Sequence, residues 1–193
     1  MDLFFQFDRF SFIMFYLITV LWLMEFILFP SNARNRDRSE TRTFLKISAV
    51  IIASIALSVV ATAHGLFIVE GRRTVLAVIS YVTYPLGLSL RYVSIHYLGR
   101  HFTRDVEVSE TQELVSNGPY AILRHPLYLG LFLLTVSVPL FLSNWLMTIV
   151  SGLSMFVVLN ERMTIEERMM EDAIGVHYAN WKNERYRFIP WVY

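Results

Sequence analysis

The sequence contains no cysteine. Disulfide bonds, thiolate nucleophiles and cysteine-ligated metal sites are therefore all excluded. Histidine is scarce as well, with five residues in the whole chain. Of these, His96 and His101 lie five positions apart at a predicted helix end, which places them on different helix faces, where they could not share an ion. We therefore expect no metal site.

Other common signatures are also missing. None of the eight glycines forms a G-x-G-x-x-G pattern after a strand, and there is no phosphate-binding P-loop. A nucleotide-type cofactor, if one binds, is therefore not held by a Rossmann domain. The first apolar run has no basic region before it and no small-residue cleavage site after it, so we expect no cleavable signal peptide. The net charge of +1 indicates no partner by itself, and we expect no nucleic acid to bind.

What the chain has in excess is apolar residues, which make up 55% of it and give a mean hydropathy of +0.46. They lie in long blocks, and five of these are long enough, or nearly so, to cross a bilayer. The five apolar segments are residues 10–29, 45–69, 75–98, 126–142 and 145–160.

These segments predict an all-α polytopic membrane protein of about five transmembrane helices, in a single domain over 1–193. Three spans lie in 1–98, and Pro85 should bend or break the third of them. Ser143-Asn144 joins the last two segments, and so short a joint predicts an antiparallel helical hairpin. A helical tail should follow the hairpin on the cytoplasmic side.

The distribution of basic residues predicts the orientation. Loop 31–46 is basic, and basic loops remain on the cytoplasmic side of a membrane. Its charges are Arg34, Arg36, Arg38, Arg42 and Lys46. By alternation, 99–125 and the tail return to that side, while the uncharged hairpin turn lies outside; Arg72 and Arg73 are a minor contrary signal. We therefore expect a multi-pass protein with its N-terminus outside and its active site facing the cytoplasm.

Residues 118–130 form a polar, aromatic stretch at the mouth of the fourth apolar segment. It includes Tyr120, Arg124, His125 and Tyr128. Because a charge in hydrocarbon costs at least about 2.5–3.5 kcal/mol, such residues should line a cavity or bind a ligand. His125 precedes a proline and marks the joint between loop and helix. His125 could therefore serve either as a structural cap or interfacial anchor, or as a contact to a ligand.

A second polar group occurs in the tail, which reads as a helix ending at Gly175. Arg162 and Glu166 are four positions apart and so share one face of that helix. They could form a surface salt bridge, although arginine before glutamate is the less favourable order. Alternatively, Arg162 meets an anionic substrate and Glu166 meets a cation. Two ionisable residues inside apolar segments, His64 and Arg91, could pair with each other or reach towards the membrane surface.

Several motifs follow one another in the second half of the chain. They are Gly118-x-Tyr120, Arg124-His125-Pro126-x-Tyr128, Arg162-x-x-x-Glu166-Glu167, Gly175-x-x-Tyr178 and Arg187-Phe-Ile-Pro190. In this order and spacing, residues 99–193 resemble the isoprenylcysteine carboxyl methyltransferase family. Its members are integral membrane enzymes that use S-adenosylmethionine. The first two spans carry no motif of the family.

The resemblance implies a cofactor pocket and a substrate contact within 99–193. The cofactor-binding residues would be Gln112, Leu114, Val115, Tyr120, His125, Pro126, Tyr128, Glu166 and Glu167. Arg162 would bind the substrate, and Arg162 and Glu166 would be the catalytic pair. This chain departs from the family pattern at two positions, because many members have histidine where Gln112 stands and relatives often have tyrosine where Trp181 stands.

The implied activity is transfer of a methyl group from S-adenosylmethionine to the carboxylate of an isoprenylcysteine-like compound. The partners would be a lipophilic or prenylated substrate and the membrane lipid. Three alternatives remain: the same architecture acting on a lipid amine or thiol, an NADPH-dependent membrane reductase of the sterol type, and a non-enzymatic membrane scaffold. The Glu166-Glu167 pair argues against the reductase, because a phosphate-rich cofactor favours lysine or arginine.

Overall fold

The computed structural model describes residues 9–28, 38–68, 73–99 and 114–193. Within these ranges all the regular structure is helical, with two isolated β-bridges. The elements are α1 (Arg9–Leu28), α2 (Arg38–Ala63), α3 (Arg73–Leu98), the 3₁₀ turn η4 (Gly118–Ala121), α4 (Pro126–Phe141), α5 (Trp145–Ile174) and α6 (Val176–Asn183). The predicted all-helical class is confirmed.

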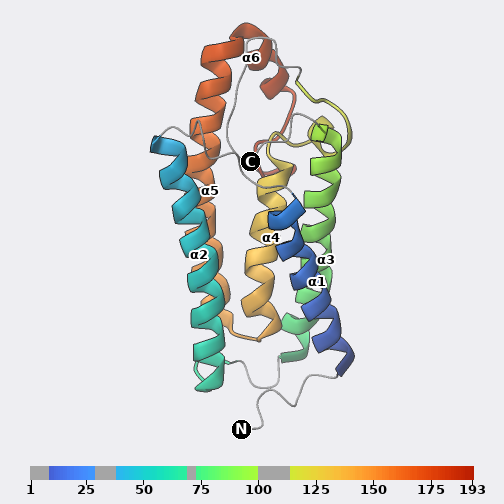
Figure 1. Ribbon diagram of the computed structural model, residues 1–193, viewed down its shortest axis with the longest axis vertical. Helices are drawn as coiled ribbons and strands as arrows, with labels where there is room; N and C mark the ends of the chain where they lie inside the picture. The colour runs from blue at the N-terminus through green and yellow to red at the C-terminus, as the bar shows by residue number, and fades with distance from the viewer. Residues whose placement is uncertain (1–8, 29–37, 69–72, 100–113) are drawn as a thin grey trace.

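Helix α4 is the centre of the bundle, and α1, α2, α3 and α5 run alongside it (Figure 1). Its most extensive packing is against α3, through two glycines that let the helices approach closely. A Cβ on Gly87 would lie 2.9 Å from the carbonyl oxygen of Gly130, which leaves no room for any larger residue. Helix α5 extends beyond the others at the upper end of Figure 1, where α6 folds back.

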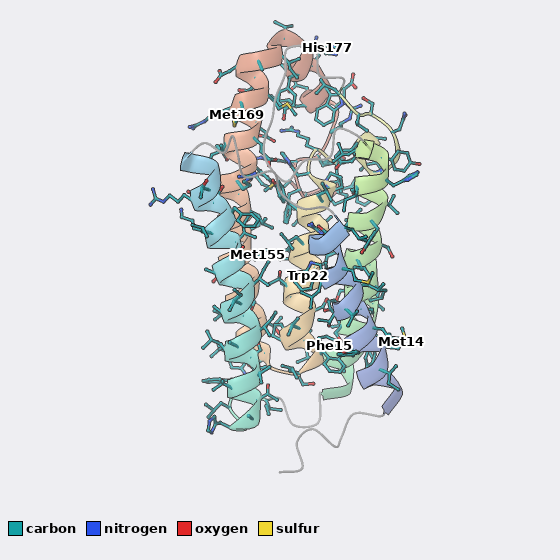
Figure 2. All side chains as sticks on the ribbon, viewed as in Figure 1. Met14, Phe15, Trp22, Met155, Met169 and His177 are labelled. Atoms are coloured by element: carbon teal, nitrogen blue, oxygen red, sulfur yellow. The ribbon has the colours of Figure 1, made fainter. Side chains whose placement is uncertain are left out.

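The core joins residues from α1 to α5 in one cluster. Leu134 of α4 and Met155 and Leu159 of α5 are completely buried in it. The ring of Phe15 on α1 stacks on Tyr84 of α3, with centroids 4.7 Å apart. Figure 2 shows Phe15, Trp22 and Met155 along the bundle, and His177 at its upper end on α6.

The outer faces of four helices are apolar and exposed. Half or more of the surface of large side chains on α1, α2, α3 and α5 is accessible, among them Leu17, Ile52, Val82, Leu153 and Val157. Apolar surface of this extent is typical of proteins that contact a membrane or a partner. Two described segments, Thr41–Ala63 and Trp145–Ile174, are long and apolar enough to cross a bilayer. The five predicted crossings remain a prediction.

The predicted hairpin between the last two apolar segments is confirmed. Asn144 is buried and begins α5, because its side-chain oxygen accepts a hydrogen bond from the Met147 N–H at 3.1 Å. Its Nδ2 donates to the Leu66 carbonyl at 3.0 Å, which ties the end of α2 to the turn. The turn therefore holds α4 and α5 antiparallel and fixes their register.

Some predicted boundaries change. Helix α2 ends at Ala63, before the end of its apolar segment at residue 69, because Gly65 and Phe67 adopt left-handed backbone conformations. Helix α3 continues through Pro85 without a break. The fifth apolar segment and the tail helix form one 30-residue helix that stops at Gly175. The predicted division between the three N-terminal spans (1–98) and the part that carries the motifs (99–193) stays a prediction. Helices from the two parts pack together, because α3 packs on α4.

Candidate functional site

The candidate site lies where the first turn of α4 faces the middle of α5. His125 is the N-cap of α4, and Pro126 occupies its first turn, where a fixed backbone angle favours helix initiation. The His125 ring makes no capping hydrogen bond and instead stacks on Tyr128, with centroids 5.7 Å apart. The loop-to-helix joint predicted at His125 is therefore confirmed. Because the imidazole ring does not cap α4, it can contact side chains of α5.

Glu166 is the centre of the first half of the site. The Tyr128 hydroxyl donates a hydrogen bond to its Oε1, and Arg162 Nε donates to the same oxygen at 3.2 Å. His125 Nδ1 lies 3.6 Å from the other carboxylate oxygen. Arg162 is buried, with 4% of its surface exposed, and its Nη1 donates to Thr43 Oγ1 of α2 at 3.0 Å. The predicted Arg162–Glu166 pair is thus real and lies inside the protein.

Glu167 is the centre of the second half and has more cationic neighbours. Its carboxylate lies 3.3 Å from Arg124 Nη1 and 3.2 Å from Arg187 Nε. His125 Nε2 lies 3.1 Å from Glu167 Oε1, so the two glutamates flank one imidazole ring. Among the described residues, two guanidinium groups contact Glu167 and one contacts Glu166. Within the described ranges, Glu166 is therefore the carboxylate whose charge is less fully compensated by side chains.

Residues 185–188, near the C-terminus, bind the segment 120–124 that precedes α4. The Arg124 N–H donates to the Tyr186 carbonyl at 2.8 Å, and the Tyr186 N–H donates to the Ile122 carbonyl at 3.0 Å. Arg185 Nε donates to the Tyr120 carbonyl at 2.8 Å. Phe188 is fully buried and packs edge-on against Phe132 of α4. These contacts hold η4 and the first turn of α4 in place against α5.

Tyr120 lies in η4 and is buried. Burial raises the pKa of its phenol far above the ordinary value, and the charge of Glu166 raises it further, while Arg91 opposes both. The hydroxyl is therefore neutral at physiological pH. Gly118, two residues earlier, has a φ of +58°, and a Cβ there would clash with the Tyr97 ring.

The structure brings together His125, Tyr128, Arg162, Glu166 and Glu167 from the predicted set. Pro126 supports this cluster from the first turn of α4, and Tyr120 is near enough to feel the charge of Glu166. Leu114 and Val115 are half-buried in the segment that leads into η4, and the contacts above do not include them. Gln112 lies outside the described residues.

Sequence reasoning missed three contributors. Arg124 and Arg187 were noted only as motif members, and nothing local indicated that they contact Glu167. Thr43 lies 119 positions from Arg162 in an apolar helix, with no motif around it. The suggested pairing of Arg91 with His64 is wrong, because Arg91 Nε donates to Glu25 at 2.6 Å. His64 is exposed in the turn after α2.

No group of three or more histidine, aspartate or glutamate side chains in the described ranges could hold a metal ion. The charged residues of the site are instead paired with one another. A guanidinium such as that of Arg162 can bind an anionic group, and a carboxylate beside aromatic rings, such as Glu166 beside Tyr128, can bind a cationic one. Together they suit a ligand that carries both charges.

The sequence of residues 78–172 matches the isoprenylcysteine carboxyl methyltransferase family. Among curated proteins, the chain is similar to the protein-S-isoprenylcysteine O-methyltransferase of Saccharomyces cerevisiae, with 28% identity over 55% of this chain and 46% of that protein. The Tribolium castaneum enzyme of the same name is 30% identical over 55% of this chain and 39% of its own length. The match thus spans less than half the length of these relatives.

A longer match exists with a probable protein-S-isoprenylcysteine O-methyltransferase of Oryza sativa subsp. indica, 22% identical over 87% of this chain and 89% of that protein. A solved structure of a eukaryotic intramembrane Ras methyltransferase, isoprenylcysteine carboxyl methyltransferase, has the same fold. The TM-score is 0.64 at 22% identity, over 94% of this chain and 67% of that one. Over residues 78–172, about half of its length, this chain is therefore similar to the isoprenylcysteine carboxyl methyltransferase family.

Proposed function

We propose that the protein transfers a methyl group from S-adenosylmethionine to the carboxylate of a lipophilic, isoprenylcysteine-like substrate. The observation that carries this proposal is the buried Arg162 beside Glu166 and Tyr128, inside the part of the chain that matches the family. The curated relatives bear the name of this activity.

The chemistry of the side chains fits S-adenosylmethionine. This cofactor carries a sulfonium, an ammonium group, a carboxylate and an adenine ring, and when bound it supplies an activated methyl group. Glu166, with a single guanidinium neighbour among the described residues, is suited to a cation. The faces of Tyr120 and Tyr128 suit a sulfonium through cation–π attraction.

The other proposed cofactor residues have supporting roles. Leu114, Val115 and Pro126 offer apolar surface for the adenine ring, and Gln112 offers a hydrogen-bonding amide. Glu167 fits best as a partner that orients His125, because two arginines already compensate its charge.

Arg162 is proposed to hold the substrate carboxylate. The guanidinium is held in place by Thr43 on α2 and by Glu166 one turn along α5, so little rotational freedom is left to lose when an anion binds. A carboxylate is already ionised at neutral pH, so the reaction needs no strong general base. What the side chains must supply is in-line placement of the two reactants, which can lower the barrier by about 7–11 kcal/mol.

The membrane arrangement is part of the proposal. We infer five crossings, an integral membrane location, an N-terminus outside and a site that faces the cytoplasm. Exposed apolar side chains on α1 and α3, as well as on the two candidate spans, support five crossings. The site end of the bundle also carries Lys46, which pairs with Glu161 at 2.6 Å, and most basic residues of the tail.

A methyl-transfer assay with a labelled cofactor tests the function. The purified protein, in detergent or lipid discs, is offered a panel of lipophilic carboxylates, amines and thiols of matched chain length. Label should enter the carboxylates in a base-labile form typical of a methyl ester. Label found only in the amines or thiols would contradict carboxyl methylation while keeping a methyltransferase.

A further inference from the structure

A bidentate ion pair joins α1 to α3 within the apolar bundle. Arg91 Nε donates to Glu25 Oε2 at 2.6 Å, and Arg91 Nη2 donates to the other carboxylate oxygen. Glu25 is completely buried and Arg91 is 8% exposed. Because burying two charges costs about as much as their attraction returns, apolar residues of similar size would join the helices equally well. Stability alone therefore does not explain why a buried ion pair is present at this position.

A third contact of Arg91 provides an explanation. Its Nη1 donates to the carbonyl of Leu127 at 3.1 Å. Leu127 stands in the first turn of α4, directly before Tyr128 and two residues after His125. A charged donor to a backbone carbonyl makes a strong hydrogen bond, so Arg91 fixes this turn relative to α3.

In the next turn of α4, a glycine leaves room for the Arg91 side chain. A Cβ on Gly130 would lie 2.6 Å from Arg91 Cγ, so the aliphatic part of Arg91 lies directly against the α4 backbone. Helix α3 packs against both α4 and α1 (Figure 1). Contacts thus run without interruption from Glu25 through Arg91 to the turn that carries both site residues of α4.

We propose that Glu25 and Arg91 are positioning residues that set the first turn of α4, and through it the placement of His125 and Tyr128 against the two glutamates. This role gives α1, which carries no family motif, a part in the active site. The structural claim stands on the contacts alone; its effect on methyl transfer rests on the proposed function. A displacement of about 1 Å at reacting groups can lower a rate on the order of 100-fold.

The same two helices offer a matched control. Thr19 Oγ1 and the Tyr84 hydroxyl form a partly buried hydrogen bond of 2.8 Å between α1 and α3. It lies about two helix turns from the ion pair, and in the described part of the chain neither partner forms a hydrogen bond to Leu127, whose carbonyl accepts from Arg91. Tyr84→Phe therefore removes a polar contact between α1 and α3 while keeping the ring and leaving the first turn of α4 untouched.

The test compares Glu25→Met/Arg91→Met, Arg91→Lys and Tyr84→Phe with the unchanged protein. The double substitution removes both charges with little change of volume, so folding should be retained. Lysine keeps the charge opposite Glu25 but lacks the planar fork needed to reach Glu25 and Leu127 together. It keeps the proposal testable if the double variant fails to fold.

Two readouts are measured, and the first needs no activity. Hydrogen exchange of the amides of residues 127–134, followed by mass spectrometry, should become at least about tenfold faster in both Arg91 variants and stay unchanged in Tyr84→Phe. For methyl transfer, kcat should fall on the order of 100-fold in the Arg91 variants, with a smaller change in substrate KM. Tyr84→Phe should keep the kcat of the unchanged protein.

Unchanged exchange at residues 127–134 in the folded Arg91 variants would overturn the positioning role, whatever the activity. Faster exchange with full kcat would overturn its importance for catalysis. Absence of methyl transfer in the unchanged protein would instead count against the proposed function, and the exchange readout would still decide the role of the pair.

Discussion

At the scale of single residues, the adjacent glutamates of α5 differ in their surroundings. Glu167 contacts Arg124 and Arg187, whereas Glu166 shares Arg162 with the Tyr128 hydroxyl. Consecutive residues on a helix point about 100° apart, so each meets a different set of partners. This difference lets the two carboxylates be tested separately.

Glu166→Gln should weaken S-adenosylmethionine binding about tenfold or more, because the amide keeps the shape of the carboxylate but loses its charge. Glu167→Gln should instead lower the free energy of unfolding by about 1–3 kcal/mol, because it leaves two partly buried guanidinium groups without their carboxylate. Calorimetry in detergent and thermal unfolding measure the two effects. Equal losses of affinity in both variants, with equal stability, would contradict the division.

Arg162→Ala should raise the KM for a carboxylate substrate at least about tenfold, since a charge-assisted hydrogen bond to the substrate is lost. Cofactor affinity should change much less. Steady-state kinetics and cofactor calorimetry on the same sample give both numbers. If cofactor affinity falls as far as substrate affinity, Arg162 does not serve the substrate in particular.

Residue-level prediction succeeded where partners are close in sequence or belong to one motif. Arg162 and Glu166 are one helical turn apart, so their pairing follows from spacing. The partners Thr43 and Glu25 lie 119 and 66 positions from the arginines they meet. Their contacts depend on how α1 and α2 pack on the bundle, and no local pattern encodes that packing.

At the scale of helices, the α4–α5 turn joins the two helices that carry the site, at the opposite end of the bundle from it. Asn144→Ala removes the cap of α5 and the hydrogen bond to Leu66, and should cost about 2 kcal/mol of unfolding free energy. Because the turn lies at the end of the bundle away from the site, kcat should remain within about twofold. Thermal unfolding and the methyl-transfer assay check both statements, and an Asn144→Ser variant, which keeps an oxygen able to cap α5 without adding a charge, serves as the control.

The α3–α4 crossing should tolerate no larger residue. Gly87→Ala places a methyl group 2.9 Å from the Gly130 carbonyl oxygen and should destabilise the protein by about 1–3 kcal/mol. Gly152→Ala in α5 is the matched control, because its nearest neighbour would be 3.7 Å away, and it should be neutral or slightly stabilising. Equal melting temperatures for the two variants would show that the helices are not closely packed at Gly87.

Helix positions were largely predictable because long apolar runs and a two-residue joint leave few arrangements. The stop of α2 at Ala63 was missed, since the run stays apolar up to residue 69 and only the left-handed backbone after Ala63 ends the helix. Of the bend or break predicted at Pro85, only the break is excluded, because a proline removes one hydrogen bond but neighbouring helices can hold the chain helical.

At the scale of the molecule, the absence of cysteine makes the predicted orientation directly testable. Leu66 lies beside the hairpin turn, and the Glu184 side chain is 76% exposed after α6, at the site end. In intact cells, Leu66→Cys should react with a membrane-impermeant maleimide, and Glu184→Cys should react only after permeabilisation. The reverse pattern would contradict a site that faces the cytoplasm, and the cysteine-free parent is the control for background labelling.

The central claim is that the α4–α5 site binds S-adenosylmethionine. The most direct measurement is calorimetric titration of the purified protein in detergent with S-adenosylmethionine or its demethylated product, and separately with NADPH. We predict saturable one-site binding of the methyl donor or its product that Glu166→Gln weakens, and no binding of NADPH. Tight binding of NADPH with none of the methyl donor or its product would contradict the account.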